Sequence, residues 1–210
     1  MTEEKKEHPL AVDAPESDVT PLTLTMVSNL LSMSRETSRK RMIQRVHKSD
    51  SAGVHKMFNA LQPGTYIMPH RHMHPEKTET ILVMSGALLF VEFEDTGEYR
   101  THTLLQPGTE IFGVDVAPNV YHTFVALKPD TLIFEVKDGP YTTDTDKDVP
   151  DWAPREGSEE AEPYLLELIK HLAELTNAAA ERVEAEKKAA EAQQAEQNAE
   201  QDSEEEKPAE

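Results

Sequence analysis

Two histidines one residue apart, together with a glutamate and a more distant third histidine, are the residues best suited to chemistry in this chain. His70 and His72 flank Arg71, and Glu79 and His122 follow. Alternate side chains of an extended strand point to the same face, so His70 and His72 can bind one ion while Arg71 points away. Three imidazoles and one carboxylate form a partly open ligand set that suits Fe(II), Mn(II), Ni(II), Co(II) or Zn(II). The sequence therefore predicts one divalent metal ion on His70, His72, Glu79 and His122, and it leaves the identity of the metal open.

The spacing of these residues matches the first cupin motif, in which two glycines frame a His-x-His pair and a glutamate. The positions are filled by Gly64, His70, His72, Glu79 and Gly86. The stretch between His72 and Glu79 is longer than the usual gap, and Glu76 stands at the usual distance, so Glu76 is the alternative ligand. Glu79 is preferred because it alone keeps the interval to Gly86 and begins an apolar run.

A looser match to the second cupin motif surrounds the third histidine. Gly108 and His122 fit the motif, whereas Ala117 stands where proline is usual and Asn119 where glycine is usual. Asparagine is the commonest residue other than glycine at positive φ, so the predicted turn survives that exchange. Ala126 replaces the final asparagine of the motif, and its polar contact is lost.

Further stretches extend the similarity beyond the two motifs, at His47 and at residues 38–41, 59–66, 69–72, 75–77, 134–137, 139–141, 146–148 and 152–154. On these stretches the central region, about residues 38–157, resembles the WbuC-type family of cupin-fold metalloproteins. The resemblance implies a single cupin domain with a bound divalent metal, and it implies a homodimer. The reaction of that family is not established, so the resemblance predicts the fold better than the function.

Composition narrows the classes of function. The chain has 210 residues and no cysteine, which excludes disulfides, thiolate metal sites and cysteine nucleophiles. The net charge of −19 is concentrated towards the two ends of the chain, and the mildly acidic centre argues against nucleic acid or an anionic membrane as a partner. No apolar run is long enough to span a bilayer, and the first residues lack the apolar segment of a signal peptide. We therefore expect a cytoplasmic protein that binds a small-molecule ligand or substrate.

Changes in pattern divide the chain into four segments. Polar, proline-bearing residues 1–22 are predicted to be a disordered arm, and residues 23–157 a cupin domain that begins with a helix at 23–36. Residues 158–182 are predicted to be an amphipathic helix and 183–210 an acidic low-complexity tail. Within the domain, strand-like runs fall at residues 42–47, 56–61, 65–70, 79–84, 86–94, 99–105, 111–116, 121–127 and 131–137. These runs predict a mainly β fold, a small cupin barrel (double-stranded β-helix) of jelly-roll type, followed by a helical or disordered acidic tail.

Three residues are candidates for catalysis. Glu135 and Lys137 alternate with apolar residues, so they line the pocket if their side of the strand faces inward. His47 precedes most of the strand-like runs, where it either contacts substrate as an acid or base or is a partly buried strand residue.

Three other residues are candidates for substrate binding. Arg39 and Arg41 belong to a basic run, and guanidinium groups bind phosphate or carboxylate through paired hydrogen bonds. The alternative is that the run is a solvated strand edge whose charge prevents aggregation. Tyr66 shares the alternation of His70 and His72, so we expect it to face the cavity, either as packing or as a substrate contact. His74, in the same hairpin, is interpreted as a solvated loop residue.

Three classes of function fit these residues. The first is a metal-dependent enzyme acting on a sugar or sugar phosphate, as an isomerase or epimerase, in which the ion polarises a substrate oxygen while a histidine or glutamate moves a proton. The second is an Fe(II)-dependent dioxygenase. The third is a module that binds or senses a small ligand through the metal without turnover.

Overall fold

The computed structural model describes residues 8–143 and 146–178. The chain divides after Leu165 into two units. The first unit contains all the strands and helix α1, and the described residues of the second, 166–178, are helical. No helix among the described residues combines the length and the apolar character that crossing a membrane requires. The predicted tail at 183–210 lies outside the described residues, and the four predicted segment boundaries stay predictions.

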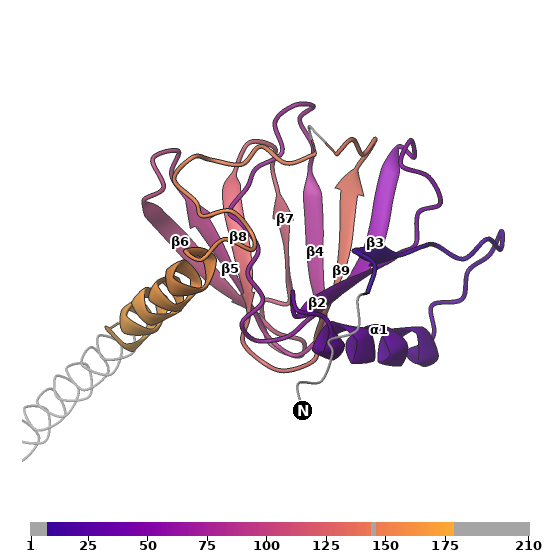
Figure 1. Cartoon of the computed structure of the whole chain (residues 1–210), viewed down its shortest axis with the longest axis horizontal. Helices are drawn as coiled ribbons and strands as arrows, with labels where there is room; N and C mark the ends of the chain where they lie inside the picture. Colours follow the sequence, from indigo (N-terminus) through magenta and orange to yellow (C-terminus); the bar gives the residue numbers. More distant parts are fainter. Residues whose placement is uncertain (1–7, 144–145, 179–210) are drawn as a thin grey trace, which may run out of the picture. The chain divides into compact units, whose positions relative to one another are not determined.

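Two sheets form the first unit (Figure 1). The larger has the order β1-β2-β3-β9-β4-β7, with β1 (Ala11–Val12), β2 (Arg41–Arg45), β3 (Val54–Leu61), β4 (Glu79–Ser85), β7 (Gly113–Val116) and β9 (Thr131–Asp138). The smaller has the order β6-β5-β8, with β5 (Leu88–Phe93), β6 (Tyr99–Leu105) and β8 (Tyr121–Ala126). All neighbouring pairs are antiparallel except β1 with β2. The prediction of a mainly β fold of the cupin, jelly-roll type is confirmed.

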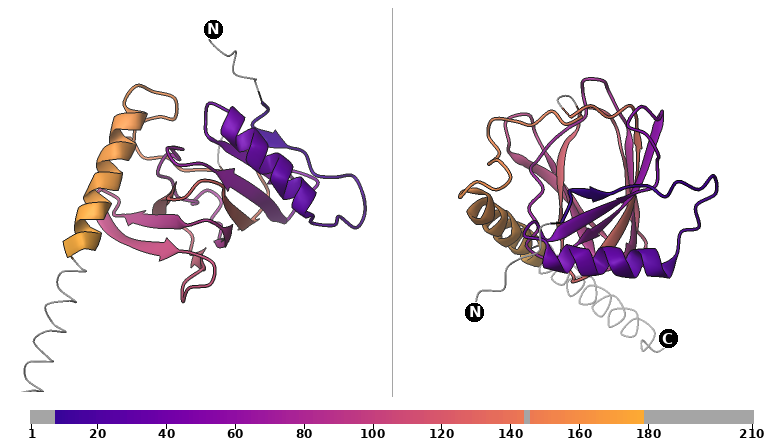
Figure 2. Two further views of the ribbon diagram at one scale, coloured as in Figure 1. Left: turned by 90° about the horizontal axis from the view of Figure 1, so that it is seen from below. Right: turned by 45° about the vertical axis from the view of Figure 1, so that its right-hand side comes forward.

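Helix α1 (Leu24–Glu36) matches the helix predicted at residues 23–36. It begins after Thr23, whose hydroxyl accepts a hydrogen bond from the backbone N–H of Met26 and so satisfies one of the free donors of the first turn. Its buried Leu30 packs with Met42 of β2 and Phe58 of β3. Figures 1 and 2 show α1 beside these strands. The helix therefore covers the outer face of the larger sheet and leaves the inner face free.

The inner faces of the two sheets are apolar at one end and polar at the other. Ile81 and Ile133 of the larger sheet belong to one buried cluster with Phe90 and Phe124 of the smaller sheet. On the same strands, the next inward positions are occupied by polar side chains, among them Glu79, His122, Glu135 and Lys137. The alternation that builds the core therefore also aims these polar groups into the space between the sheets.

The strand predicted at residues 65–70 is not formed. His70 makes only an isolated bridge with His122, beside β8, where a fourth strand of the smaller sheet would lie. Pro69 has no backbone N–H to donate. The Ile67 carbonyl accepts from the hydroxyl of Thr123 at 2.6 Å, and the Met68 carbonyl contacts the ring of His70 at 3.0 Å. Side chains therefore take the carbonyl groups that a strand ladder would use.

Part of the segment predicted to be a disordered arm is paired. Ala11 and Val12 form β1, which runs parallel to β2 opposite Ile43 and Gln44. The Gln44 side-chain amide also donates to the Asp13 carbonyl at 2.9 Å. The segment buries little apolar area, which is why disorder was predicted. Hydrogen bonds to a neighbouring strand edge hold it instead. Residues 1–7 of the predicted arm lie outside the described residues.

We predict that Gly86→Ala destabilises the fold. Gly86 has a φ of +82°, and a Cβ there would lie 2.7 Å from the Cα of Thr131. The expected loss is about 3 kcal/mol of unfolding free energy, measured by urea denaturation. Gly53→Ala is the control, because nothing lies within 4 Å of a Cβ at that position, and its unfolding free energy should stay within about 1 kcal/mol of wild type. Equal stabilities of the two variants would contradict the close-approach argument.

Candidate metal centre

The structure brings together the four side chains that the sequence proposed as metal ligands. His70, His72, Glu79 and His122 are all buried, and their potential ligand atoms lie within 4.8 Å of one another. Glu79 is the first residue of β4 and His122 the second of β8, so the two sheets contribute one each. Paired backbone hydrogen bonds between His70 and His122 connect the His-x-His segment to β8. Glu76, the alternative ligand, is exposed and outside the group.

Backbone carbonyls fix the direction of all three imidazoles. Nδ1 of His70 lies 3.0 Å from the Met68 carbonyl, and Nδ1 of His122 lies 2.9 Å from the Val120 carbonyl. Nδ1 of His72 makes a short hydrogen bond to the Asp146 carbonyl. A carbonyl can only accept, so each Nδ1 carries a proton, and in a neutral ring Nε2 is then left with a free lone pair. This is the arrangement in which histidines bind metal ions through Nε2.

The environment of these lone pairs fits a cation. Nε2 of His72 is buried without a hydrogen-bond partner among the described residues. Nε2 of His122 lies 3.2 Å from Oε2 of Glu79. Once Nδ1 holds the only proton of the ring, two acceptors face each other there, unless a proton or a metal ion lies between them. Burial lowers the pKa of His70 well below its ordinary value, so that ring is neutral near pH 7.

Two buried carboxyl groups beside the histidines have opposite pKa shifts. Burial acts to raise the pKa of Glu79, but hydrogen bonding with His122 and the contacts with His72 and Glu135 hold it well below its ordinary value. Burial and the charge of Glu79 raise the pKa of Glu135 to about 8. Glu79 is therefore ionised and Glu135 protonated near neutral pH, because two adjacent carboxyl groups in a buried site do not both ionise readily.

A buried network of ion pairs around Asp146 adjoins the histidines. The carboxylate of Asp146 accepts from Nζ of Lys77 at 2.8 Å and from Nζ of Lys137 at 2.9 Å. Burial acts to lower the pKa of Lys137, but Glu135, Glu79 and Asp146 raise it above its ordinary value. Lys137 therefore keeps its charge and is a poor proton acceptor, which argues against the predicted catalytic role and favours a structural one. Asp146 also provides the carbonyl that orients His72.

A cavity of about 460 Å³ opens beside the histidines. The inner face of the larger sheet lines it, including Arg41 of β2, Asn59 of β3, Glu79 of β4 and Glu135 of β9. Glu135 accepts from the Asn59 side-chain amide at 2.8 Å. The same cavity is lined by three further residues that the sequence proposed for catalysis or substrate binding: Arg39, His47 and Lys137.

Tyr66 does not line the cavity, contrary to the prediction. Its hydroxyl donates to the Pro154 carbonyl at 2.8 Å, and its ring packs edge-on against Tyr164. The alternation used for Tyr66 assumed a continuous strand, and residues 65–69 do not form one. Tyr66 is therefore a packing residue rather than a substrate contact.

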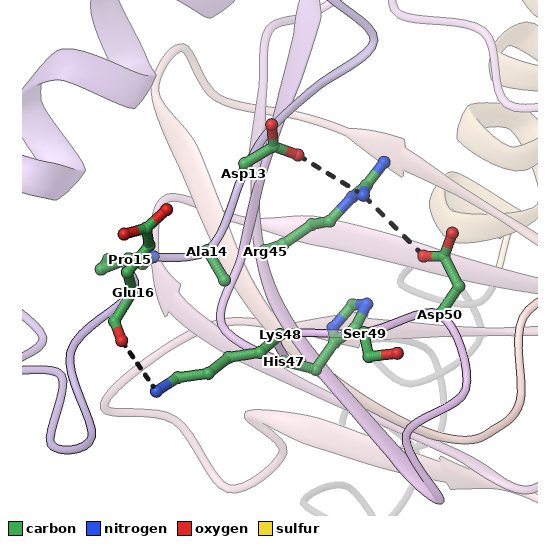
Figure 3. Close-up of a pocket in the computed structure, with 9 residues that line it drawn as sticks. All are labelled: Asp13, Ala14, Pro15, Glu16, Arg45, His47, Lys48, Ser49 and Asp50. Carbon is green, nitrogen blue, oxygen red and sulfur yellow. Dashed lines mark hydrogen bonds and ion pairs between the residues drawn. The ribbon is translucent and has the colours of Figure 1, made fainter.

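His47 lies between two cavities. It also borders a second cavity, of about 420 Å³, between β2, the loop that follows it and the segment around Asp13 (Figure 3). Its ring stacks on His55 with centroids 4.0 Å apart, and its Nδ1 contacts the Lys56 backbone. Figure 3 shows Arg45 paired with Asp13 and Asp50. His47 is thus held at the edge of the large cavity and is not among the residues gathered at the metal centre.

Sequence reasoning missed several cavity or support residues, among them Lys77, Asp146, Lys147 and Glu156. Lys77 is almost fully buried, Lys147 lines the cavity, and Glu156 pairs with Arg41. The stretches 75–77 and 146–148 carried part of the WbuC-type resemblance, which was the available signal for the two lysines and Asp146 but not for Glu156. Periodicity gave no sign of them, because they lie in loops.

Residues 22–105 match the model of a family described as "Domain of unknown function (DUF6016)". No curated protein matches this chain. The WbuC-type resemblance therefore stays a prediction.

Solved structures similar to this chain include CapF with an inhibitor, 3-isopropenyl-tropolone (17% identity, TM-score 0.43, covering 51% of this chain and 31% of that one). An oxalate oxidase in complex with the substrate analogue glycolate has 19% identity and a TM-score of 0.38, and the match covers 48% of this chain and 51% of that one. KdgF from Halomonas sp. has 24% identity and a TM-score of 0.36, with 49% and 82% covered. The matched region spans about a third of the CapF chain and about half of the oxalate oxidase chain.

We predict that His70→Ala abolishes retention of a divalent metal, since it removes one buried donor from the group. The measurement is elemental analysis of purified protein, followed by titration with Zn(II). His74→Ala is the matched control, because His74 lies in the same hairpin but is exposed and outside the group. Unchanged metal content in His70→Ala would exclude this centre.

We predict that Asp146→Ala lowers the stability of the metal-free protein by about 3 kcal/mol, because two buried ammonium groups lose their partner. Urea denaturation measures the loss. Asp95→Ala is the control, since the ion pair of Asp95 with Arg71 is at the surface and its loss should cost no more than about 1 kcal/mol. A loss as small in Asp146→Ala as in the control would show that the network is not stabilising.

Proposed function

We propose that the protein binds one divalent metal ion through His70, His72, Glu79 and His122 and is a metal-dependent enzyme acting on a small oxygen-rich substrate, such as a sugar or sugar phosphate, as an isomerase or epimerase. The observation that carries the proposal is the inward direction of three imidazole lone pairs beside an ionised carboxylate. When bound, such an ion polarises a substrate oxygen. The WbuC-type resemblance adds a homodimer to the proposal.

The cavity supports a small polar substrate. Its volume of about 460 Å³ suits a small molecule, and its lining combines apolar residues with ionisable ones. His70 and Glu79 of the metal group line it, so a molecule in the cavity reaches the centre.

Glu135 is the residue that we assign to proton movement. It lies on β9 beside Glu79, faces the same cavity, and is held in place by Asn59. A carboxyl group in this position can pass a proton to or from a substrate carbon or oxygen next to the metal group. Lys137 keeps its charge through its ion pair with Asp146, so its contribution is to the electrostatics of the site.

The test of this function is exchange of hydrogen with solvent. The metal-loaded protein is incubated in deuterated water with aldoses, ketoses and their phosphates, and deuterium uptake next to the carbonyl carbon is followed by NMR. Glu135→Gln should retain the metal and lose at least about a hundredfold in exchange rate. His70→Ala should lose both the metal and the exchange.

The metal itself separates this proposal from the dioxygenase alternative. Elemental analysis of protein purified without oxygen should find zinc, nickel, manganese or cobalt. Iron, together with substrate-dependent oxygen consumption, would contradict the isomerase proposal, and so would an absence of exchange with every substrate of the panel.

A further inference from the structure

We propose that the cavity beside the metal centre contains an anion-binding subsite formed by Lys147, Arg39 and Arg41 around Glu156, which would hold a carboxylate or phosphate group of the ligand. This inference deepens the proposed function by giving the charge class of the substrate. It concerns side chains outside the metal group, so it can fail while the metal centre stands.

Glu156 identifies the cluster, because it pairs with one of the three cations and lies near enough to the other two for its charge to act on them. It forms a short ion pair with Nη2 of Arg41, and its other oxygen accepts from the Met68 backbone N–H at 3.3 Å. Its negative charge also acts on Arg39 and Lys147. All four residues line the one cavity. Within these four residues, one carboxylate and three cations give a net charge of plus two.

Of the three cations, Lys147 is the one whose charge acts on a residue of the metal group. Its charge acts on His70, while Glu79 and Glu135 act on it in return. Its amino group has no ion pair within the described residues, unlike that of Lys137 in the same cavity. An ammonium group without an ion pair beside a cavity attracts an anion, and a ligand bound there would lie in the same cavity as both Lys147 and the metal group.

Arg39 and Arg41 supply planar donors on the other side of Glu156. Arg39 is half-buried and donates to the Leu10 carbonyl at 2.9 Å, so its position is fixed without neutralising its charge. Arg41 lies on the inward face of β2 and also donates to the Tyr66 carbonyl. Arginine binds carboxylate and phosphate oxygens through two parallel hydrogen bonds. The guanidinium group of Arg39 can form them, because a backbone carbonyl rather than an ion pair holds it in place.

The remaining cations of the cavity are already neutralised. Arg45 pairs with Asp13 and Asp50, and Lys137 pairs with Asp146. The excess charge is thus localised on the cluster around Glu156. A solvated strand edge, the alternative interpretation of the basic run, does not account for Lys147, which is distant in sequence and faces the same cavity.

The test is calorimetric titration of the full-length protein with inorganic phosphate and, separately, with malonate, with and without bound Zn(II). Lys147→Met should weaken binding of the preferred anion about tenfold, the loss of one charge-assisted hydrogen bond. Glu156→Gln should strengthen it, because a competing negative charge is removed. Lys128→Met is the control, since Lys128 is exposed and outside the cavity, and its affinity should equal that of wild type.

The outcomes separate the two proposals. Tighter binding of phosphate assigns a phosphate group to the ligand, and tighter binding of malonate assigns a carboxylate. Loss of affinity in Lys147→Met with unchanged Zn(II) affinity supports the subsite, whether or not the protein proves to be an isomerase. Absence of binding of both anions, or equal affinities in wild type, Lys147→Met and Lys128→Met, overturns it. A failure of Zn(II) to bind overturns the metal centre instead, and the titration without metal still tests the subsite.

Discussion

Hydrogen bonds from imidazole Nδ1 groups to backbone carbonyls decide how the three histidines point, and the rest of the site depends on that direction. The carbonyls of Met68, Val120 and Asp146 each hold one ring. In the other tautomer, a protonated Nε2 would face the ligand group and the lone pair of Nδ1 would face the backbone carbonyl. Backbone groups are fixed by the fold, so the orientation of the three imidazole rings does not depend on flexible side chains.

Polar partners also explain why several charged groups are tolerated between the two sheets. Removing a charge from water is costly unless it gains a partner, and the charges of Lys77, Lys137 and Asp146 have partners in one another. Asp146 compensates Lys77 and Lys137, and Glu79 faces the histidines. The segment around Asp146 is further tied to the His-x-His segment by paired backbone hydrogen bonds between Arg71 and Asp148. The loop that supplies the Asp146 carbonyl is therefore anchored at several points.

Much of the fold was predictable because periodicity reflects burial. Helix α1 and eight of the expected strands follow the predicted runs closely, and Asn119 has the positive φ expected from its turn. The run at 65–70 has a strand-like composition but is not a strand, since two of its carbonyls bond to the side chains of Thr123 and His70. Composition cannot reveal such a competitor. The misplacement of Tyr66 has the same origin.

The sequence by itself determined which residues were chemically able to hold a metal, because the residue types and the spacing of His70, His72 and Glu79 are local properties. The two motifs already favoured Glu79 and His122, but only the tertiary structure placed them beside His70 and His72. It alone also decided that Asp146 and Glu156 organise the lysines and arginines around the cavity. These outcomes depend on the register of β4 with β9 and on loops distant in sequence. Such contacts leave no periodic trace in the chain, since the energy of a buried ion pair comes from partners that meet only after folding.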